Sequence, residues 1–382
     1  MPVPADLVFA AANAEALREI ASWDGFRPAT FAASEFPVDV VRFERSASPP
    51  VVLSRARRAE SLKALPASLR ERAQRVFERA ERRTPFLLLA RGGRLDLSGG
   101  PAVMGVVNVT PDSFSDGGLH FDRAQAVARA LEMFDAGAAI VDVGGESTRP
   151  ASYGEAVAVS AEEEIGRVLP VIQGIRSSTD RPLSIDTRKA SVARAALAAG
   201  ADLVNDVSAL RYDPEMLALV AEENPGVLLM HMRGTDPRTM QADTAYAHPV
   251  ADVALELAAA ASRAIDAGVV ADRIAVDPGL GFGKSSEGNL LLLRHLAAFR
   301  SLGFAVAAGA SRKAFVRRYS GVAEDASSAD RLPGSLAALA AARSGGAAIV
   351  RVHDIEESVR FLRMVAAIET PAVRQPAGAA AR

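Results

Sequence analysis

From residue 101 onward, short apolar runs alternate with longer segments in which apolar residues recur with the period of a helix. Each short run is continuously apolar, which is typical of parallel strands that helices cover on both faces. Several of the longer segments, such as residues 122–137 and 251–268, end in glycine, a residue that commonly terminates helices. The predicted strands are residues 103–109, 139–143, 182–186, 202–206, 226–232, 273–277, 304–309 and 347–352.

Eight strand–helix units therefore follow one another between residues 101 and 370. A closed (β/α)8 barrel takes about 250 residues, so this length favours a barrel over an open doubly wound sheet. We expect an α/β protein in which residues 99–370 form a (β/α)8 TIM barrel. The polar, alanine-rich residues 371–382 predict a disordered tail.

The first 98 residues have a different pattern. Residues 55–83 contain ten Arg or Lys and four Glu around an apolar stripe, which predicts a basic amphipathic helix with a solvated outer face. Residues 86–100 predict a hairpin that turns at Gly92 and Gly93. We place a domain boundary near residue 98 and interpret residues 1–98 as a smaller α+β accessory domain for packing or assembly.

Composition narrows the class of protein. Of the 382 residues, 49% are hydrophobic and 24% are charged, so the chain can bury a large core. The 44 Lys and Arg residues nearly balance 46 Asp and Glu, which gives no global reason to expect nucleic acid or an anionic membrane as a partner. The chain contains no cysteine, no apolar run of the length that spans a bilayer and no secretion signal at its amino terminus. We expect a soluble, cytoplasmic protein.

Polar residues end the predicted strands. In a (β/α)8 barrel the carboxyl ends of all strands surround one mouth, where the active site lies. Burying so many ionisable groups without a ligand would cost roughly several kcal/mol of folding free energy, so we expect a polar small molecule to bind there. The residues at these ends are Asn108, Asp142, Glu146, Asp186, Asn205, Asp206, His231, Asp277, Ser311, Arg312, Lys313, Arg351 and His353.

The side-chain types divide into two groups. One group supplies carboxylates, an amide and an ammonium that can pair with a flat heterocycle bearing an amino group, ring N–H donors and a carbonyl oxygen. Its members are Asp186, Asn205, Asp277 and Lys313. The other group, Asn108, Arg351 and His353, supplies donors near the first and last strands, close to where such barrels commonly bind phosphate. The sequence therefore predicts a heterocycle on one side of the mouth and a phosphate on the other.

Two long loops follow the first two strands. Residues 108–121 and 144–157 combine Gly, Ser, Thr, Pro and Asp, a composition that suits mobile covers carrying polar groups. By contrast, residues 279–286, GLGFGKSS, lack the register of a nucleotide phosphate loop. The five histidines show no spacing of metal ligands, which argues against a structural zinc site and leaves open a hard cation with oxygen ligands.

Seven sequence blocks now point to a family. In chain order they read MGVVNVTPDSFSDGG, VDVGGESTRP, LSIDTRK, VNDVSA, IAVDPGLGFGK, GASRKAF and VRVHD, each at a predicted strand end. Together they resemble the dihydropteroate synthase family of folate biosynthesis, over essentially residues 101–370. The resemblance implies that 6-hydroxymethyl-7,8-dihydropterin diphosphate condenses with 4-aminobenzoate by a carbocation-like displacement to give 7,8-dihydropteroate and pyrophosphate. It also implies Mg²⁺ as cofactor, a homodimer and a sulfonamide target.

The resemblance assigns roles to matching residues. The pterin would contact Asp186, Asn205, Asp277, Phe282 and Lys313. The pyrophosphate would contact Asn108, Arg351 and His353, with Asn108 also on the metal. The aminobenzoate pocket would comprise Phe114, Thr148, Arg149, Pro150 and Ser311. The catalytic group would be Asp186, Asp112, Asp116 and Lys313, where Asp112 and Asp116 order the first loop.

Two positions depart from the family pattern. Ala151 stands where the family often has Gly, and Ala314 stands where a Ser is common near the aminobenzoate carboxylate.

Three other functions compete with this interpretation. A methyltetrahydrofolate methyltransferase domain resembles the same barrel, but its reaction does not need the side chains that would bind a diphosphate. A non-catalytic pterin-binding regulator would not need both loops. A Schiff-base aldolase would use Lys313 as nucleophile, yet no carbonyl-substrate pattern surrounds it.

Overall fold

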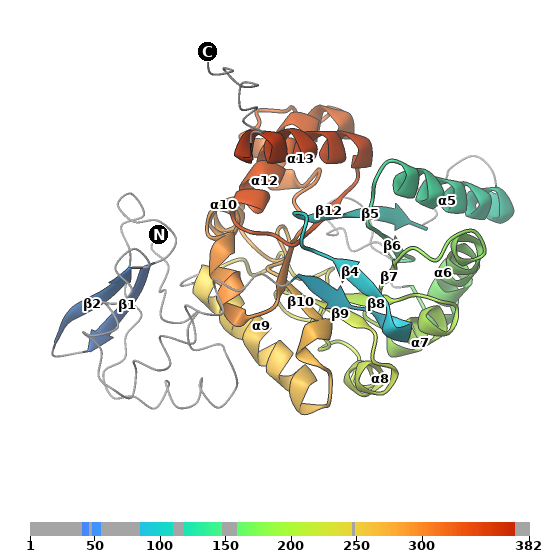
Figure 1. Ribbon diagram of the computed structural model, residues 1–382, viewed down its shortest axis with the longest axis horizontal. Helices are drawn as coiled ribbons and strands as arrows, with labels where there is room; N and C mark the ends of the chain where they lie inside the picture. Colours follow the sequence, from blue (N-terminus) through green and yellow to red (C-terminus); the bar gives the residue numbers. More distant parts are fainter. Residues whose placement is uncertain are drawn as a thin grey trace, which may run out of the picture.

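A computed structural model describes residues 40–45, 48–54, 85–109, 118–146, 159–246 and 249–370 of the chain (Figure 1). The predicted basic helix at 55–83, the predicted tail at 371–382 and most of the proposed accessory domain lie outside these ranges. Within the first 84 residues the structure describes the backbone of two antiparallel strands, β1 (Val40–Arg45) and β2 (Ser48–Ser54).

Eight parallel strands form a closed barrel, as the sequence predicts. Their order around the barrel is β10-β11-β12-β5-β6-β7-β8-β9, and each overlaps one of the eight predicted runs. The strands are β5 (Ala102–Asn108), β6 (Ile140–Gly144), β7 (Leu183–Asp186), β8 (Leu203–Asp206), β9 (Gly226–Met230), β10 (Ile274–Asp277), β11 (Ala305–Ala308) and β12 (Ile349–Val352).

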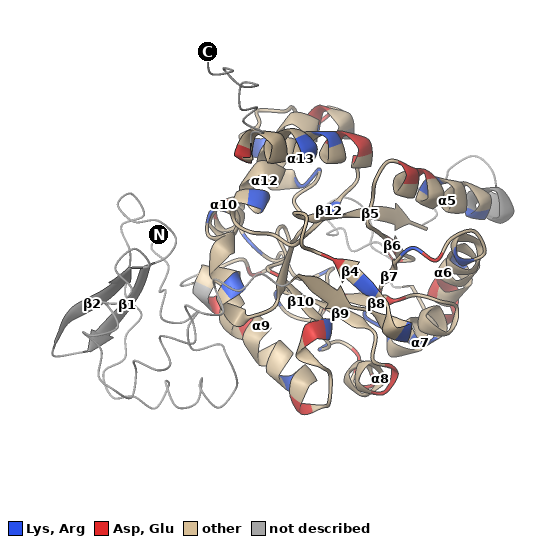
Figure 2. Cartoon of the chain, in the orientation of Figure 1, with Lys and Arg blue, Asp and Glu red and all other residues tan. Residues whose placement is uncertain are grey.

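Helices surround the barrel (Figure 1). They are α5 (Gly118–Asp135), α6 (Ala161–Arg176), α7 (Ala190–Ala198), α8 (Met216–Glu223), α9 (Pro249–Asp266), α10 (Ser286–Arg294), α11 (Ala314–Tyr319), α12 (Leu332–Ser344) and α13 (Ile355–Glu369). Short 3₁₀ turns lie at Ala90–Gly92, Ala271–Arg273, Leu296–Leu302 and Ser328–Arg331. In α6, Ser160 caps the first turn through its side-chain oxygen, and Val168, Ile172 and Ile175 face the buried layer against the strands. Acidic and basic residues are interspersed over the outer helices (Figure 2).

The hairpin predicted at residues 86–100 packs under the barrel. Its strands, β3 (Phe86–Leu88) and β4 (Arg94–Asp96), pair antiparallel, and the chain turns at Arg91 and Gly92, which have φ values of 54° and 74°. Four hairpin leucines are buried against residues at the amino ends of the barrel strands. These leucines are Leu87, Leu89, Leu95 and Leu97.

Hydrogen bonds fasten the hairpin to the barrel. The amide of Ala90 donates to the carbonyl of Asp202 at 3.0 Å, and Nη1 of Arg273 donates to the carbonyl of Leu89 at 2.6 Å. The predicted boundary near residue 98 therefore divides residues that pack together, and the barrel unit includes the chain from residue 85. The sequence missed this because a hairpin pattern does not say what its apolar face covers. No helix in the described ranges is long and apolar enough to cross a membrane.

Candidate active site

A cavity opens at the carboxyl ends of the strands, where barrels of this type bind their small-molecule ligands. Its walls come from the ends of six of the eight strands, β7 to β12, so residues far apart in sequence meet there. Eight of the predicted site residues line it: Asp186, Asn205, Asp277, Phe282, Ser311, Lys313, Arg351 and His353. Asn108 ends β5 at the same face of the barrel but is not among the lining residues. The predicted residues Asp112, Phe114, Asp116, Thr148, Arg149 and Pro150 lie outside the described ranges.

Arg351 lies at the centre of a charged network. Its Nε donates to Oδ2 of Asp142 at 2.7 Å, and its Nη2 donates to Oδ2 of Asp186 at 2.7 Å. Asp142 also accepts a 2.9 Å hydrogen bond from Nδ2 of Asn205. Because Asp142 is fully buried, it fixes both Arg351 and Asn205 from inside the barrel. The sequence predicted Asp142 as one of the polar residues around the mouth, but Asp142 does not line the cavity and binds Arg351 and Asn205 instead.

The pKa of Asp186 is raised to about 7. Burial is the largest cause, and repulsion from Asp142, Glu164 and Asp206 adds to it, while Arg351 acts in the opposite direction. A carboxyl group with this pKa exchanges its proton near neutrality, a property that is frequent at functional sites.

Asp277 and Lys313 face the cavity from β10 and from the turn after β11. Oδ1 of Asp277 accepts the amide N–H of Gly279 at 2.7 Å, and burial raises the pKa of this carboxyl. Nζ of Lys313 lies 4.1 Å from the centre of the Phe282 ring and donates to the carbonyl of Leu280. Burial also lowers the pKa of Lys313, to about 7. Gly281, at φ +84°, permits this approach, since a Cβ there would lie 2.8 Å from the Lys313 side chain.

Ser311 and His353, from the turns after β11 and β12, contact each other and also line the cavity. Oγ of Ser311 accepts the amide N–H of His353 at 3.2 Å and lies 3.1 Å from its Nδ1. The pKa of His353 is lowered to about 3, mostly by burial and also by Arg351 and Arg312, so the imidazole is neutral at neutral pH. Arg312 itself points away and pairs with Asp354 at the start of α13.

Comparisons with known proteins agree with this geometry. The profile of a family described as pterin binding enzyme matches residues 104–353. A dihydropteroate synthase from Synechocystis is 42% identical over 266 residues, which are 70% of this chain and 89% of the relative. The dihydropteroate synthase of Escherichia coli K12 is 42% identical over 280 residues, which are 73% of this chain and 95% of the relative. The chain belongs to the dihydropteroate synthase family. It is accordingly an enzyme, and a transferase.

Solved structures of this family have the same fold. Xanthomonas albilineans dihydropteroate synthase with 4-aminobenzoic acid matches with a TM-score of 0.68 and 43% identity, over 75% of this chain and 98% of that one. The same enzyme in complex with 7,8-dihydropteroate matches with a TM-score of 0.66 and 41% identity, over 75% and 99% of the two chains. A Yersinia pestis dihydropteroate synthase with a sulfonamide drug matches with a TM-score of 0.68 and 40% identity, over 74% and 99%.

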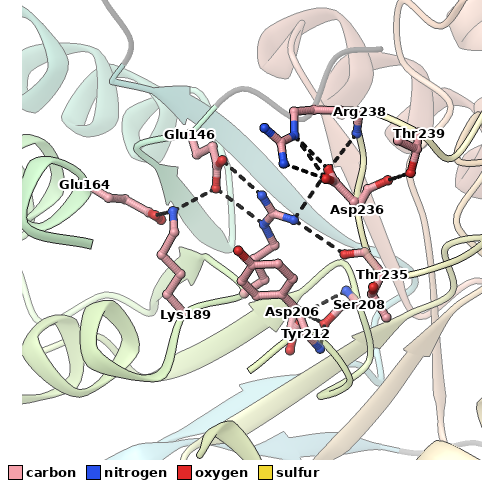
Figure 3. Close-up of polar contacts among 11 residues, drawn as sticks. Glu146, Glu164, Lys189, Asp206, Ser208, Tyr212, Thr235, Asp236, Arg238 and Thr239 are labelled. Carbon is pink, nitrogen blue, oxygen red and sulfur yellow. Dashed lines mark hydrogen bonds and ion pairs between the residues drawn. The ribbon is translucent and has the colours of Figure 1, made fainter. Parts of the chain in front are cut away.

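At the carboxyl ends of β6 and β7 lies a second network of polar contacts, which the sequence did not predict (Figure 3). Nζ of Lys189 donates to Oε2 of Glu146 at 2.9 Å and to Oε2 of the fully buried Glu164 at 2.5 Å. Nη2 of Arg188 donates to Oε1 of Glu146 at 3.1 Å, and its guanidinium lies 3.9 Å from the centre of the Tyr212 ring. Burial opposes the charge of Lys189, but its two carboxylate partners outweigh that effect and raise its pKa.

Like Asp142, Glu146 and Arg312, two further strand-end residues proposed as ligands of a small molecule have other partners. Both carboxylate oxygens of Asp206 cap the turn after β8: Oδ1 accepts the amide and hydroxyl of Ser208, each at 2.7 Å, and Oδ2 accepts the amide of Leu210 at 2.9 Å. His231 turns into the protein and lies 2.9 Å from Nζ of Lys284 through its Nδ1. Neither residue lines the cavity.

Proposed function

We propose that this enzyme condenses 6-hydroxymethyl-7,8-dihydropterin diphosphate with 4-aminobenzoate to give 7,8-dihydropteroate and pyrophosphate. The observation that carries the proposal is a single cavity lined by Asp277, Asn205 and Lys313 together with Arg351 and His353. The relatives crystallised with 4-aminobenzoic acid and with 7,8-dihydropteroate support the choice of substrate and product.

The first group suits the pterin. Carboxylates of Asp186 and Asp277 accept from the amino group and ring N–H donors, whereas Lys313 and the amide of Asn205 donate to ring acceptors. The Phe282 ring provides an apolar wall beside Lys313. Because these groups are buried and their partners are fixed, the ring would bind in one orientation.

The second group suits the diphosphate. Arg351 carries five N–H donors, and the bonds to Asp142 and Asp186 use one on Nε and one on Nη2. The remaining N–H donors of its planar guanidinium group can bind phosphate oxygens. His353 is neutral, so it contributes a hydrogen bond and no charge.

We infer that Mg²⁺ assists the reaction through Asn108. Mg²⁺ keeps several waters and binds through one or two protein oxygens together with substrate phosphates. Asn108, partly buried at the end of β5, supplies one amide oxygen, and no group of three His, Cys, Asp or Glu side chains in the described ranges could form a separate metal site. This donor set fits an ion that binds with the diphosphate, where it would neutralise charge on the leaving group.

The proposed chemistry separates bond breaking from bond making. The bond between the pterin methylene carbon and the diphosphate oxygen breaks, and its electron pair leaves with pyrophosphate. Positive charge develops on the methylene carbon, where the nearby carboxylate of Asp186 stabilises it. The amino nitrogen of 4-aminobenzoate then bonds to this carbon and loses a proton. No protein nucleophile takes part, and Arg351 stabilises the departing charge.

For the second substrate we propose the pocket of Phe114, Thr148, Arg149, Pro150 and Ser311, with Asp112 and Asp116 ordering the first loop. We also propose that the enzyme acts in the cytoplasm as a homodimer and that sulfonamides bind in place of 4-aminobenzoate. The sulfonamide complex of the Yersinia pestis relative supports the last point. Light scattering during gel filtration tests the dimer.

Mass spectrometry tests the proposed reaction. Purified protein with both substrates and Mg²⁺ should form a species with the mass of 7,8-dihydropteroate, and omission of either substrate should abolish it. Absence of this product, with protein that binds the pterin diphosphate, would favour a non-catalytic pterin-binding role.

A further inference from the structure

Lys284 is a buried lysine that the proposed chemistry does not use. The residue is only 4% exposed and follows the glycine-rich turn between β10 and α10. Its Nζ donates to the main-chain carbonyls of Phe282 at 2.8 Å and His231 at 3.1 Å, and it lies 2.9 Å from Nδ1 of His231. All three contacts are with neutral groups, and burial lowers the pKa of the Lys284 amine well below its usual value.

His231 is oriented to accept the third bond. Its Nε2 lies 3.1 Å from Oε2 of Glu256 on α9, so the tautomer with the proton on Nε2 pairs with Glu256 and leaves Nδ1 as the acceptor for Lys284. Burial and the charge of Lys284 lower the pKa of His231 to about 4, which keeps the imidazole neutral.

The carbonyls that Lys284 binds belong to the end of β9 and to the turn after β10. This turn packs directly against β9, because a Cβ on Gly279 would lie 1.9 Å from the carbonyl oxygen of His231. Gly279, Leu280 and Phe282 of the same turn line the cavity, whereas Lys284 does not. Lys284 therefore binds this turn on the side that faces away from the cavity.

Lys313 contacts the same turn from the side of the cavity. Its Nζ donates to the carbonyl of Leu280 and lies over the ring of Phe282. A shift of the turn would move both contacts together. The two hydrogen bonds from Lys284 to main-chain carbonyls restrain the turn, and an apolar side chain in its place would leave both buried carbonyls without this donor. We therefore expect Lys284 to keep the turn in one geometry.

We propose that Lys284 is a positioning residue for the pterin half of the site, acting through Phe282 and Lys313. This inference rests on the proposed function. Lys284 lies outside the cavity, yet its replacement should change the affinity for the pterin diphosphate and leave the affinity for 4-aminobenzoate unchanged.

The test begins with wild-type turnover and with calorimetric binding of the pterin diphosphate. Failure of the wild type to bind or turn over would refute the proposed function itself. With an active wild type, Lys284→Met should weaken pterin diphosphate binding about tenfold or more, because two buried carbonyls lose their donor. The KM for 4-aminobenzoate at saturating pterin should stay within about twofold.

Arg176→Met is the matched control. Arg176 is also a poorly exposed cation that donates to main-chain carbonyls, among them those of Gly200 and Thr179, but at the opposite end of the barrel. This variant should lower the melting temperature without changing either substrate constant. If folded Lys284→Met binds the pterin diphosphate as the wild type does, or raises both KM values equally, the proposal is wrong.

The absence of cysteine from the chain allows a chemical rescue. Lys284→Cys introduces a unique thiol, which can be aminoethylated in denaturant and refolded to give a close analogue of lysine. Aminoethylation should restore pterin affinity, and a neutral ethyl group should not. If position 284 variants do not fold, His231→Leu removes one of the three partners and should weaken pterin binding alone, about threefold. Wild-type affinity in that variant would contradict the proposal.

Discussion

Nη2 of Arg351 lies 2.7 Å from Oδ2 of Asp186, although 165 residues separate them in the sequence. In the proposed reaction, this ion pair joins a residue that binds the diphosphate to one that binds the pterin. Arg351 reaches Asp142 with its other edge, so its guanidinium is fixed before any substrate arrives. A fixed cation close to the bond that breaks stabilises the leaving group without reorganisation.

The first prediction concerns pH. With a pKa raised to about 7, Asp186 carries a proton below neutrality and is ionised above it. Only the ionised carboxylate accepts bonds from ring N–H donors on both oxygens, so affinity for the pterin should rise as pH increases through about 7. Calorimetry between about pH 5.5 and about pH 8.5 measures this.

Asp186→Asn is the control for this titration. It should weaken pterin binding and remove the part of the pH dependence that belongs to Asp186. Lys313, whose pKa is lowered to about 7, titrates in the same range and accounts for what remains. An unchanged pH profile in this variant would show that Asp186 does not titrate in the free enzyme.

His353 should act on the diphosphate and not on the ring. His353→Ala removes a neutral donor beside Arg351, which should raise the Kd for the pterin diphosphate about fivefold to tenfold. Binding of the pterin alcohol, which lacks the diphosphate, should stay within about twofold. Calorimetry with both ligands checks the difference. Equal losses for the two ligands would place His353 against the ring.

Lys189 should stabilise the folded protein through its bonds to Glu146 and Glu164 (Figure 3). Lys189→Met leaves the fully buried Glu164 without its cation, which should cost about 3–5 kcal/mol of unfolding free energy. Arg194→Met removes a surface ion pair with Glu222 and should cost at most about 1 kcal/mol. Urea denaturation of both variants measures these costs, and similar values for the two would contradict the assignment.

Truncation should distinguish two boundaries. Removal of residues 1–84 keeps the hairpin under the barrel and should preserve solubility and activity. Removal of residues 1–98 deletes four buried leucines and exposes the apolar amino ends of the strands. The shorter chain should aggregate or melt at a markedly lower temperature. A fully stable and active chain beginning at residue 99 would show that the hairpin is dispensable.

Ala314 offers a test of the second substrate pocket. It begins α11, next to Lys313, at a position where the resemblance expects a serine near the aminobenzoate carboxylate. Ala314→Ser adds one hydroxyl donor and should lower the KM for 4-aminobenzoate about threefold, with pterin affinity unchanged. Steady-state kinetics with each substrate varied in turn measures both constants. A change confined to the pterin would reassign this position.

The barrel and its mouth could be predicted from sequence for a physical reason. Continuous apolar runs specify covered parallel strands, and parallel strands all end at one edge. Asp186 and Arg351 therefore had to approach each other once the strands closed into a barrel. The loops after β5 and β6 were predicted as covers, but Asp112 and Arg149 lie outside the described residues, so their roles stay predictions.

Contacts that depend on side-chain reach could not be predicted. The bonds of Lys189 to Glu164 and of Lys284 to His231 cross between neighbouring strand–helix units, and no periodicity encodes them. The sequence indicates part of the hairpin packing, because side chains alternate between the two faces of a strand and Leu87 and Leu89 therefore share one face. What that face covers became evident only from the closed barrel.

The most direct test of the central claim is the initial rate of pyrophosphate release by the purified protein. With pterin diphosphate, 4-aminobenzoate and Mg²⁺ together, we expect release in a one-to-one ratio with 7,8-dihydropteroate, and a large loss of rate in Arg351→Met. Pyrophosphate release that neither requires 4-aminobenzoate nor depends on Arg351 would contradict a cavity that joins the two substrates.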